Sequence, residues 1–433
     1  MKKLIRGILI CSALLPVVVA PNILSPFLSG KTLALRGILF LISLLTTILF
    51  FTDKEFGHSI ANRLTSLKKN RLFVSGIVFL GIIGVSTFFA FNRFLAFFSD
   101  TVRQEGFLGI ASCVVLGFFL ILFLTKKDWN RYFKLSLVAS VVILCIEFFQ
   151  AIKGMRRPES LIGNSIFLAT HYIFTLFVLG VLISAKQLVT HRSKSMLLVV
   201  SWIMIPLTLV GILLTKSRGV LVGLVVGIVV SCIYALSTAP KVKIIRNKIT
   251  IRTFSIGVIG AILIFSGTLF ATRTSTFWTH IPGINRIVAI GANDATTQSR
   301  IVIGNATLNA FMQEPFSRKI IGWGQENFIF VWNKYYTPEL FSYDSGLFDH
   351  AHNKLLDVLL MQGIVGIVGY LGMWIAAFLA IIKSRAGRRI KTVTLFFLTS
   401  YFIANLFAFD TLVTYIDLFT VFAFIVSLQN RNE

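Results

Sequence analysis

The stretch LFVSGIVFLGIIGVSTFFAF, residues 72–91, decides the class of fold. It contains no charged side chain, and as a helix it is long enough to cross the hydrocarbon core of a bilayer. Similar apolar runs of about 18 to 22 residues recur along the whole chain. The runs are continuous and do not alternate with polar residues, which excludes a transmembrane β-barrel. The sequence therefore predicts a membrane protein built from helices.

Composition supports this class. Of 433 residues, 56% are hydrophobic and only 14% are charged, with a mean hydropathy of +0.83. A soluble domain of this size needs more charge to cover its surface. The net charge of +25 would suggest nucleic-acid binding in a soluble protein. In a membrane protein it is better explained by basic loops, and we expect no nucleic acid as a partner.

We predict an all-α, polytopic membrane protein with about twelve transmembrane helices. The start, MKKLIRGILICSALLPVVVAPN, resembles a secretion signal, but Pro21 directly after Ala20 would hinder cleavage, so we expect a retained first helix. The predicted spans lie near residues 5–23, 34–52, 72–91, 107–125, 135–152, 165–185, 195–215, 219–236, 253–271, 361–382, 392–409 and 411–428.

The distribution of basic residues predicts the orientation. If the N-terminus is cytoplasmic, every cytoplasmic linker between spans carries at least three Lys or Arg residues, as the positive-inside rule requires. We therefore expect both termini in the cytoplasm of a bacterium and the spans in its inner membrane. Residues 1–271 would hold spans one to nine, residues 272–353 one large periplasmic loop, and residues 354–433 the last three spans.

Metal and disulfide sites are not indicated. The four cysteines, Cys11, Cys113, Cys145 and Cys232, all lie in apolar runs and none has CxxC spacing. The outer loops hold acidic residues, but no D-x-D pair that would suit a diphosphate-bound Mg²⁺. We expect no cofactor and no metal ligand.

Several basic residues at the outer ends of spans run against the positive-inside rule and need another explanation. Three groups stand out besides Arg273 and Arg286 at the start of the long loop. They are Lys153, Arg156 and Arg157 in KGMRRPES; Lys216 and Arg218 in TKSRG; and Arg300 in NDATTQSRIVIGNATLNAFMQEPF.

Arg218 is the most informative of these residues, because it lies in a very short turn between two apolar runs. A guanidinium held at the membrane surface is costly unless it binds an anion, and its planar fork suits a pair of phosphate oxygens. The alternative is an ordinary interfacial arginine that reaches lipid headgroups. Charge alone favours neither interpretation.

Arg300 is expected early in an amphipathic helix that begins with Thr296 or Thr297 as N-cap and ends before Pro315. Such a helix would lie along the membrane surface, and an arginine at its start suits an anion. The alternative is a solvated charge on that helix. Its apolar face would comprise Ile301, Leu308, Ala310, Phe311 and Met312.

His350 and His352 lie in FDHAHNKLLDVLLMQGIVGIVGYLGMW, where the long loop re-enters the membrane. A histidine at a loop end is more often a structural residue than a catalytic one. In the helix that follows, glycine recurs every third residue, which permits close helix contact, and packing is the favoured role. The glycines are Gly363, Gly366, Gly369 and Gly372.

Three motifs together resemble the O-antigen ligase family. His352-Asn353, nine residues, Gly363, two residues and Gly366 match that family's H-N/S/Q-x9-G-x-x-G/T/Y pattern. TKSRG at 215–219 resembles its T-x-S/T-R segment, and the QSR segment with Arg300 resembles its second arginine region. Their order and their expected side of the membrane agree, although the motifs themselves cover about a tenth of the chain.

The resemblance implies a GT-C-like membrane glycosyltransferase. It would transfer a glycan from undecaprenyl diphosphate to the lipid A–core of lipopolysaccharide, with inversion and without a metal. Arg218 and Arg300 would bind the diphosphate, and His352 would be the general base. Lys216, Arg156, Arg157, His350 and Asn353 are possible supporting residues.

Two alternatives remain open. O-antigen polymerases and protein O-oligosaccharyltransferases resemble this segment and use the same donor, and no matched residue identifies the acceptor. A lipid-linked glycan transporter is disfavoured, because Glu147 and Asp417 lie within spans but no duplicated halves are found.

Overall fold

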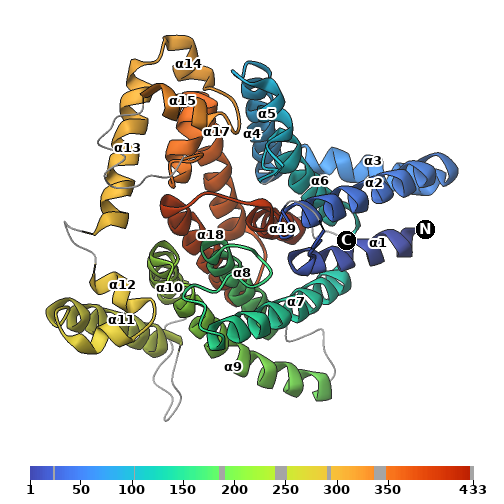
Figure 1. Cartoon of the computed structure of the whole chain (residues 1–433). Coiled ribbons are helices and arrows are strands. Elements are labelled where there is room, and N and C mark those ends of the chain that lie inside the picture. Colours follow the sequence, from blue (N-terminus) through green and yellow to red (C-terminus); the bar gives the residue numbers. More distant parts are fainter. Residues whose placement is uncertain are drawn as a thin grey trace.

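The computed structural model describes residues 1–22, 25–101, 103–184, 191–238, 251–289, 294–335 and 348–429. Within these ranges every regular element is a helix and no strand occurs, as the apolar runs predicted. Figure 1 shows the helices arranged as one bundle, with α13 to α15 standing beside the start of α17.

The first part of the chain forms a series of helices of very different lengths. They are α1 (Lys2–Cys11), η1 (Ser12–Val17), α2 (Ser29–Thr52), α3 (Lys54–Leu67), α4 (Arg71–Phe88), α5 (Arg93–Phe98), α6 (Phe107–Phe123), α7 (Lys126–Ile152), α8 (Ser165–Ser184), α9 (His191–Leu214), α10 (Arg218–Thr238) and α11 (Ile251–Ala271).

Short helices then fill the described parts of the segment predicted as a large loop, before three long helices complete the chain. The short ones are η2 (Thr276–His280), α12 (Ile284–Val288), α13 (Ala295–Gln313), α14 (Phe316–Ile321) and α15 (Phe328–Tyr335). The last elements are α17 (Lys354–Lys383), α18 (Arg388–Ala404), η3 (Asn405–Phe407) and α19 (Leu412–Gln429).

Nine helices in the described ranges are long and apolar enough to cross a membrane. They are α2, α4, α7, α8, α10, α11, α17, α18 (which the span extends to Phe407) and α19, and two further apolar helices, Phe107–Phe123 and Val199–Leu214, are shorter. The chain is therefore a multi-pass membrane protein. The total of twelve spans stays a prediction.

The first predicted span, residues 5–23, is not one continuous helix. The α-helix ends at Cys11 and a 3₁₀ segment that contains Pro16 follows it. Proline has no N–H to donate and its ring clashes with the carbonyl four residues before it, so the α-helical hydrogen-bond pattern cannot continue through this point.

The helices differ in how much of their apolar surface lies inside the protein. About nine-tenths of the apolar window of α19 is buried (89%), against 6% for α11. α19 therefore forms the centre of the bundle, and α11 lies at its edge with its side chains available to lipid. Between these extremes α10 packs along α18, α17 along α4, and α19 along α6.

A kink in α17 connects the loop helices to the bundle. Gly363 has φ of +70° and ψ of −166°, a conformation open essentially to glycine alone. The carbonyls of Leu360 and Met361 are consequently free to accept hydrogen bonds from the backbone N–H groups of Trp323 (3.0 Å) and Gly324 (2.8 Å). The loop after α14 is thereby anchored on the kinked helix.

Candidate functional site

The turn between α9 and α10 contains the sequence TKSRG and places Arg218 as the first residue of α10. Two arginines from elsewhere in the chain bind backbone carbonyls of this turn. Arg157 donates from Nε to the carbonyl of Thr215 (3.2 Å), and Arg286 of α12 donates to the carbonyl of Lys216 (3.3 Å). Lys216 itself has a positive φ of 56°. The turn is therefore held in one conformation from two sides.

Arg218 forms an ion pair with Asp294. Its two terminal nitrogens bind the two carboxylate oxygens, with 3.1 Å between Nη2 and Oδ1. Asp294 also accepts from the backbone N–H of Thr297 (3.0 Å), so it is the N-cap of α13. The prediction of Thr296 or Thr297 as N-cap was wrong, because the aspartate two or three residues earlier reaches the same free N–H groups. The guanidinium holds the pKa of Asp294 well below its usual range.

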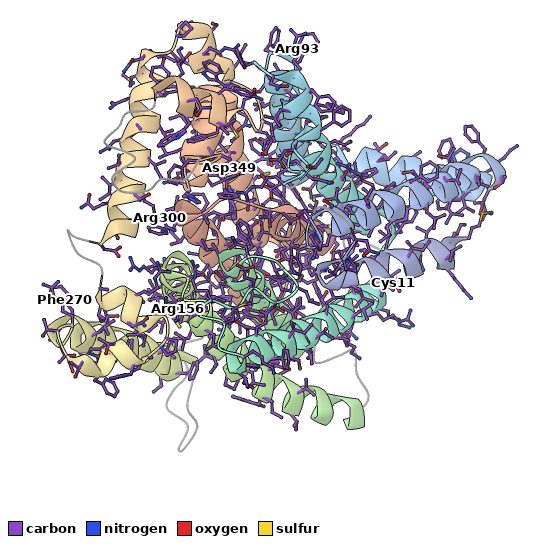
Figure 2. The ribbon with its side chains drawn as sticks, in the orientation of Figure 1. Cys11, Arg93, Arg156, Phe270, Arg300 and Asp349 are labelled. Atoms are coloured by element: carbon purple, nitrogen blue, oxygen red, sulfur yellow. The ribbon has the colours of Figure 1, made fainter. Side chains whose placement is uncertain are left out.

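Arg300 follows in the second turn of α13, whose lower end in Figure 2 lies towards the bundle. It makes no ion pair or hydrogen bond with any residue in the described ranges. Burial lowers the pKa of its guanidinium, and the positive charges of Arg218, Arg286 and Arg157 lower it further. Among the described residues Asp294 opposes Arg218, Arg286 and Arg300, and Glu159 opposes Arg157. The four arginines outnumber these carboxylates, so the group attracts anions.

These residues line one small pocket of about 60 Å³, which we call the arginine pocket. Its wall also includes Ala404 at the end of α18, and Phe407 and Ala408 from the segment that follows. The charged residues that line it are Arg157, Lys216, Arg218, Arg286 and Arg300. Residues separated by more than 140 positions in the sequence thus meet around one space that fits a few oxygen atoms.

The predicted apolar face of α13 is only partly correct. Ile301, Leu308 and Met312 are exposed on one side, as a membrane-surface helix requires, but Ala310 is buried on the opposite side. The buried side of the helix faces α15 and α17 and mixes apolar with polar residues, namely Ser299, Ile303, Thr307 and Ala310, with Glu314 directly after the helix.

His352 lies two residues before α17, with a positive φ of 51°. Its ring is half-buried between Phe348 (5.9 Å between centroids) and Phe409 (5.5 Å). Burial lowers its pKa, and the charge of Arg300 lowers it further. The imidazole is consequently neutral near pH 7 and able to accept a proton. Its ring lies against Phe409, the residue that follows Ala408 in the wall of the arginine pocket.

His350 differs from His352 in its burial, in its hydrogen bonding and in the direction in which its pKa is shifted. It is fully buried, stacks on Phe409 (3.9 Å), and its Nδ1 lies 3.1 Å from a carboxylate oxygen of Asp357. Burial alone would lower the pKa of His350, but the carboxylates of Asp357, Glu326 and Asp349 raise it to about 9. The two neighbouring histidines therefore have opposite electrostatic environments.

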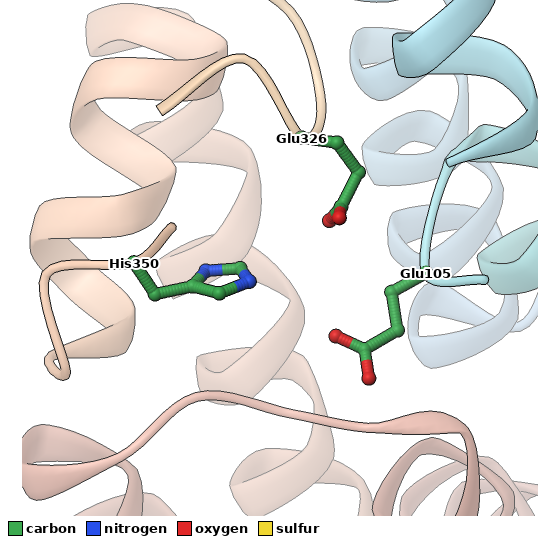
Figure 3. Close-up of side chains that lie close together, drawn as sticks. All are labelled: Glu105, Glu326 and His350. Atoms are coloured by element: carbon green, nitrogen blue, oxygen red, sulfur yellow. The ribbon is translucent and has the colours of Figure 1, made fainter. Parts of the chain in front are cut away.

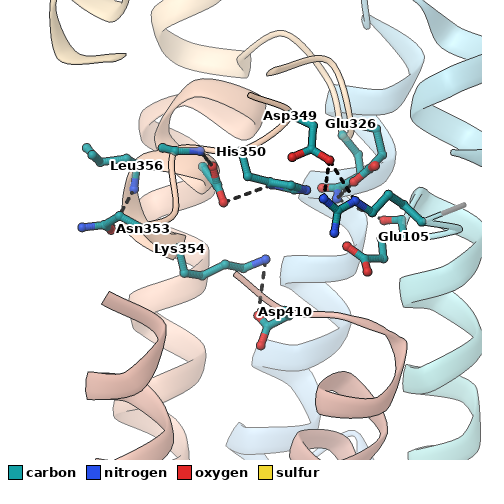
Figure 4. Close-up of polar contacts among 12 residues, drawn as sticks. Glu105, Glu326, Asp349, His350, Asn353, Lys354, Leu356 and Asp410 are labelled. Carbon is teal, nitrogen blue, oxygen red and sulfur yellow. Dashed lines mark hydrogen bonds and ion pairs between the residues drawn. The ribbon is translucent and has the colours of Figure 1, made fainter. Parts of the chain in front are cut away.

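His350 belongs to a group of charged residues that we call the polar layer (Figure 4); all but Arg103 and Asp349 are buried. Arg103 binds Asp349 (2.6 Å), and Lys354 lies 3.4 Å from Asp410 and donates to the hydroxyl of Tyr415 (2.6 Å). The members of the polar layer are Arg103, Glu105, Glu326, Asp349, His350, Lys354, Asp357 and Asp410.

Arg103 and Glu105 were missed by the sequence reasoning. Both lie in the short segment between α5 and α6, far from the three motifs. The signal that could have revealed them is the run RQE between two apolar stretches, which places charges of both signs at a predicted outer span end.

Two predicted supporting residues lie elsewhere. Arg156 is exposed and does not line the arginine pocket, although its neighbour Arg157 does. Asn353 is the N-cap of α17, where its side chain accepts from the N–H groups of Leu355 (3.0 Å) and Leu356 (3.3 Å). Its contacts position the helix that follows His352.

Comparison with protein families places part of the chain. A family model described as O-antigen ligase matches residues 199–371. The matched segment contains the TKSRG turn, Arg300, both histidines and the kink at Gly363, but not Arg103, Glu105 or Arg157. No curated protein matches the chain.

Proposed function

We propose, starting from the membership of residues 199–371 in the O-antigen ligase family, that this chain transfers a glycan from undecaprenyl diphosphate to the lipid A–core of lipopolysaccharide. Members of that family are glycosyltransferase-like enzymes that act on lipid-linked glycans. The observation that carries the proposal is the arginine pocket beside a neutral histidine.

The arginine pocket suits a diphosphate. Arg218 presents a planar fork, now bound to the carboxylate of Asp294, and a phosphate can bind the same two nitrogens. Arg300 adds a second guanidinium. When the anomeric C–O bond breaks, its electron pair goes to the diphosphate oxygen. Charge-stabilising donors of this kind typically contribute about 10²–10³ in rate each.

His352 is our candidate general base. The acceptor hydroxyl oxygen attacks the anomeric carbon and its proton passes to the neutral imidazole, a role that typically contributes about 10²–10⁴ in rate. A single direct displacement inverts the anomeric centre. Because four arginines meet the charge of the diphosphate, this step is proposed without a metal at the phosphates.

A transporter is less well supported. The two acidic residues in predicted spans both have partners in the bundle. Tyr172 donates to Glu147 (2.6 Å), and His171 lies 2.8 Å from Asp417. These pairs join α7 to α8 and α8 to α19, so packing accounts for them.

The test uses cells in which the gene for this protein is deleted and replaced by plasmid-borne variants. Their lipopolysaccharide is analysed on a gel. His352→Ala and Arg218→Ala should each abolish transfer while the protein still inserts in the membrane at normal amounts. Near-normal O-chain from either variant would contradict the role assigned to that residue.

The same deletion distinguishes the acceptors. Loss of all O-chain with accumulation of lipid-linked polymer supports a ligase. A core that carries a single repeat indicates a polymerase, and unchanged lipopolysaccharide with loss of glycoprotein staining indicates a protein acceptor.

A further inference from the structure

The polar layer contains a group of three side chains that the proposed transfer does not use. Glu105, Glu326 and His350 each direct one potential ligand atom to a common space, and these atoms lie within 4.8 Å of one another. Figure 3 shows the three side chains converging from separate segments of the chain.

Glu105 makes this group unusual. It is 2% exposed, and neither of its side-chain oxygens has a hydrogen-bond partner. A buried, ionised carboxylate without a partner is strongly disfavoured, so Glu105 must be neutralised by a proton or by a cation. Arg103, the nearest arginine along the chain, is already bound to Asp349.

The charge of the whole layer leads to the same conclusion. Five carboxylates, those of Glu105, Glu326, Asp349, Asp357 and Asp410, face only two permanently cationic side chains, Arg103 and Lys354. A histidine that binds a cation through Nε2 is neutral, so the excess in the bound state is three negative charges. A single divalent cation would compensate two of them.

His350 is oriented as metal-binding histidines are. Asp357 holds its Nδ1, which leaves Nε2 directed to the carboxylates of Glu105 and Glu326. A carboxylate on the far ring nitrogen fixes the ring and increases the basicity of the ligating nitrogen. The second carboxylate is fixed as well, because Ser99 (3.1 Å) and Gln325 (3.0 Å) donate to the two oxygens of Glu326.

We propose that Glu105, Glu326 and His350 bind a divalent cation of the class that accepts both nitrogen and oxygen ligands, such as Mn²⁺ or Zn²⁺. Opposite ligands of an octahedral ion with bonds near 2.1 Å are about 4.2 Å apart, so a small rotation of the unpartnered Glu105 closes the site. The cation would join the α5–α6 segment, the α14–α15 loop and the loop that carries His352. It would position that loop without touching the reacting atoms.

The test measures binding of Mn²⁺ to the purified full-length protein in detergent. We expect about one ion per chain by elemental analysis after dialysis, and a higher Tm in the presence of Mn²⁺ because the ion binds only the folded state. A nitrogen coupling in the pulsed EPR spectrum should identify the histidine ligand. Glu105→Gln, Glu326→Gln and His350→Gln should each lose the bound ion and the shift in Tm.

Glu147→Gln is the matched control, since it removes a buried carboxylate from α7 outside the polar layer. It should bind Mn²⁺ as the unaltered protein does. Failure of the unaltered protein to bind, or equal binding by Glu105→Gln, would overturn the proposal. If the unaltered protein does not bind Mn²⁺, a proton shared by Glu105 and Glu326 would neutralise the pair instead of a cation. Glu105→Gln should then leave Tm unchanged. The readouts do not depend on transfer activity, so they do not depend on the proposed function.

Discussion

At the scale of single residues, the chemistry of the site follows from which charges have partners. Arg218 has the carboxylate of Asp294, whereas Arg300 has no ion-pair partner within the described ranges. The pKa of Asp294 is lowered, so this pair stabilises the protein above the ordinary aspartate pKa and is lost only as the pH falls through the lowered value. Near neutral pH Asp294 is therefore ionised and offsets one positive charge of the arginine pocket, while the charge of Arg300 is not paired in this way.

Arg300→Ala should reduce the initial rate of transfer by about 10²–10³, measured in vitro with a purified lipid-diphosphate glycan. Arg156→Ala is the matched control, because this arginine is exposed and outside the pocket, and it should keep a nearly normal rate. Equal losses in the two variants would indicate a general effect of positive charge and would exclude a specific contact of Arg300 with the diphosphate.

At the scale of elements, the glycines of α17 have different roles. A Cβ at Gly363 would meet the backbone carbonyl of Lys319 at 2.7 Å, and at Gly369 it would meet the side chain of Ile82 at 2.5 Å. A Cβ at Gly372 would meet nothing within 4 Å. The packing role predicted for the glycines is therefore confirmed for the first two of these and wrong for Gly372, whose side of the helix is open.

Gly363→Ala should destabilise the protein by about 1–3 kcal/mol, because alanine cannot adopt the backbone conformation of the kink without strain. The measurement is the Tm of the purified protein, with the amount in the membrane as a second readout. Gly372→Ala serves as control and should leave Tm unchanged or raise it slightly, since alanine favours a helix. An unaltered Tm in Gly363→Ala would show that the kink can straighten.

At the scale of the whole molecule, the packing order of the helices agrees with a membrane bundle. α19 is surrounded by other helices, while α11 is exposed along nearly its whole length. An exposed apolar helix is stable only where lipid covers it. The arginine pocket and the polar layer are both built from segments that join helices, so the candidate chemistry lies at helix ends.

The predicted orientation is tested with alkaline phosphatase, which is active only outside the cytoplasm. A fusion after His280 should be active, because that residue lies in the segment predicted to face the periplasm. Fusions after Ser384 and after Gln429 should be inactive. Activity after Gln429 would place the C-terminus outside and would refute the even number of spans.

Sequence alone determined the class of fold. Repeated apolar runs of bilayer length with little charge between them require lipid around them, and in lipid a continuous apolar run satisfies its backbone as a helix. It also indicated Arg218 and Arg300, whose charges at outer span ends the positive-inside rule does not explain, and His352 through the family resemblance. Their roles in the reaction stay predictions. It predicted neither the break at Pro16 in its predicted first span nor the N-cap at Asp294.

Only the tertiary structure decided which charges meet. Arg157 and Arg286 reach the same turn from opposite sides in the sequence, and Glu105 meets His350 across more than 240 positions. The physical reason is that a residue's local sequence reports its own polarity, whereas its neutralising partner is set by helix packing. The difference between His350 and His352, two residues apart in one motif, is the clearest result of that packing.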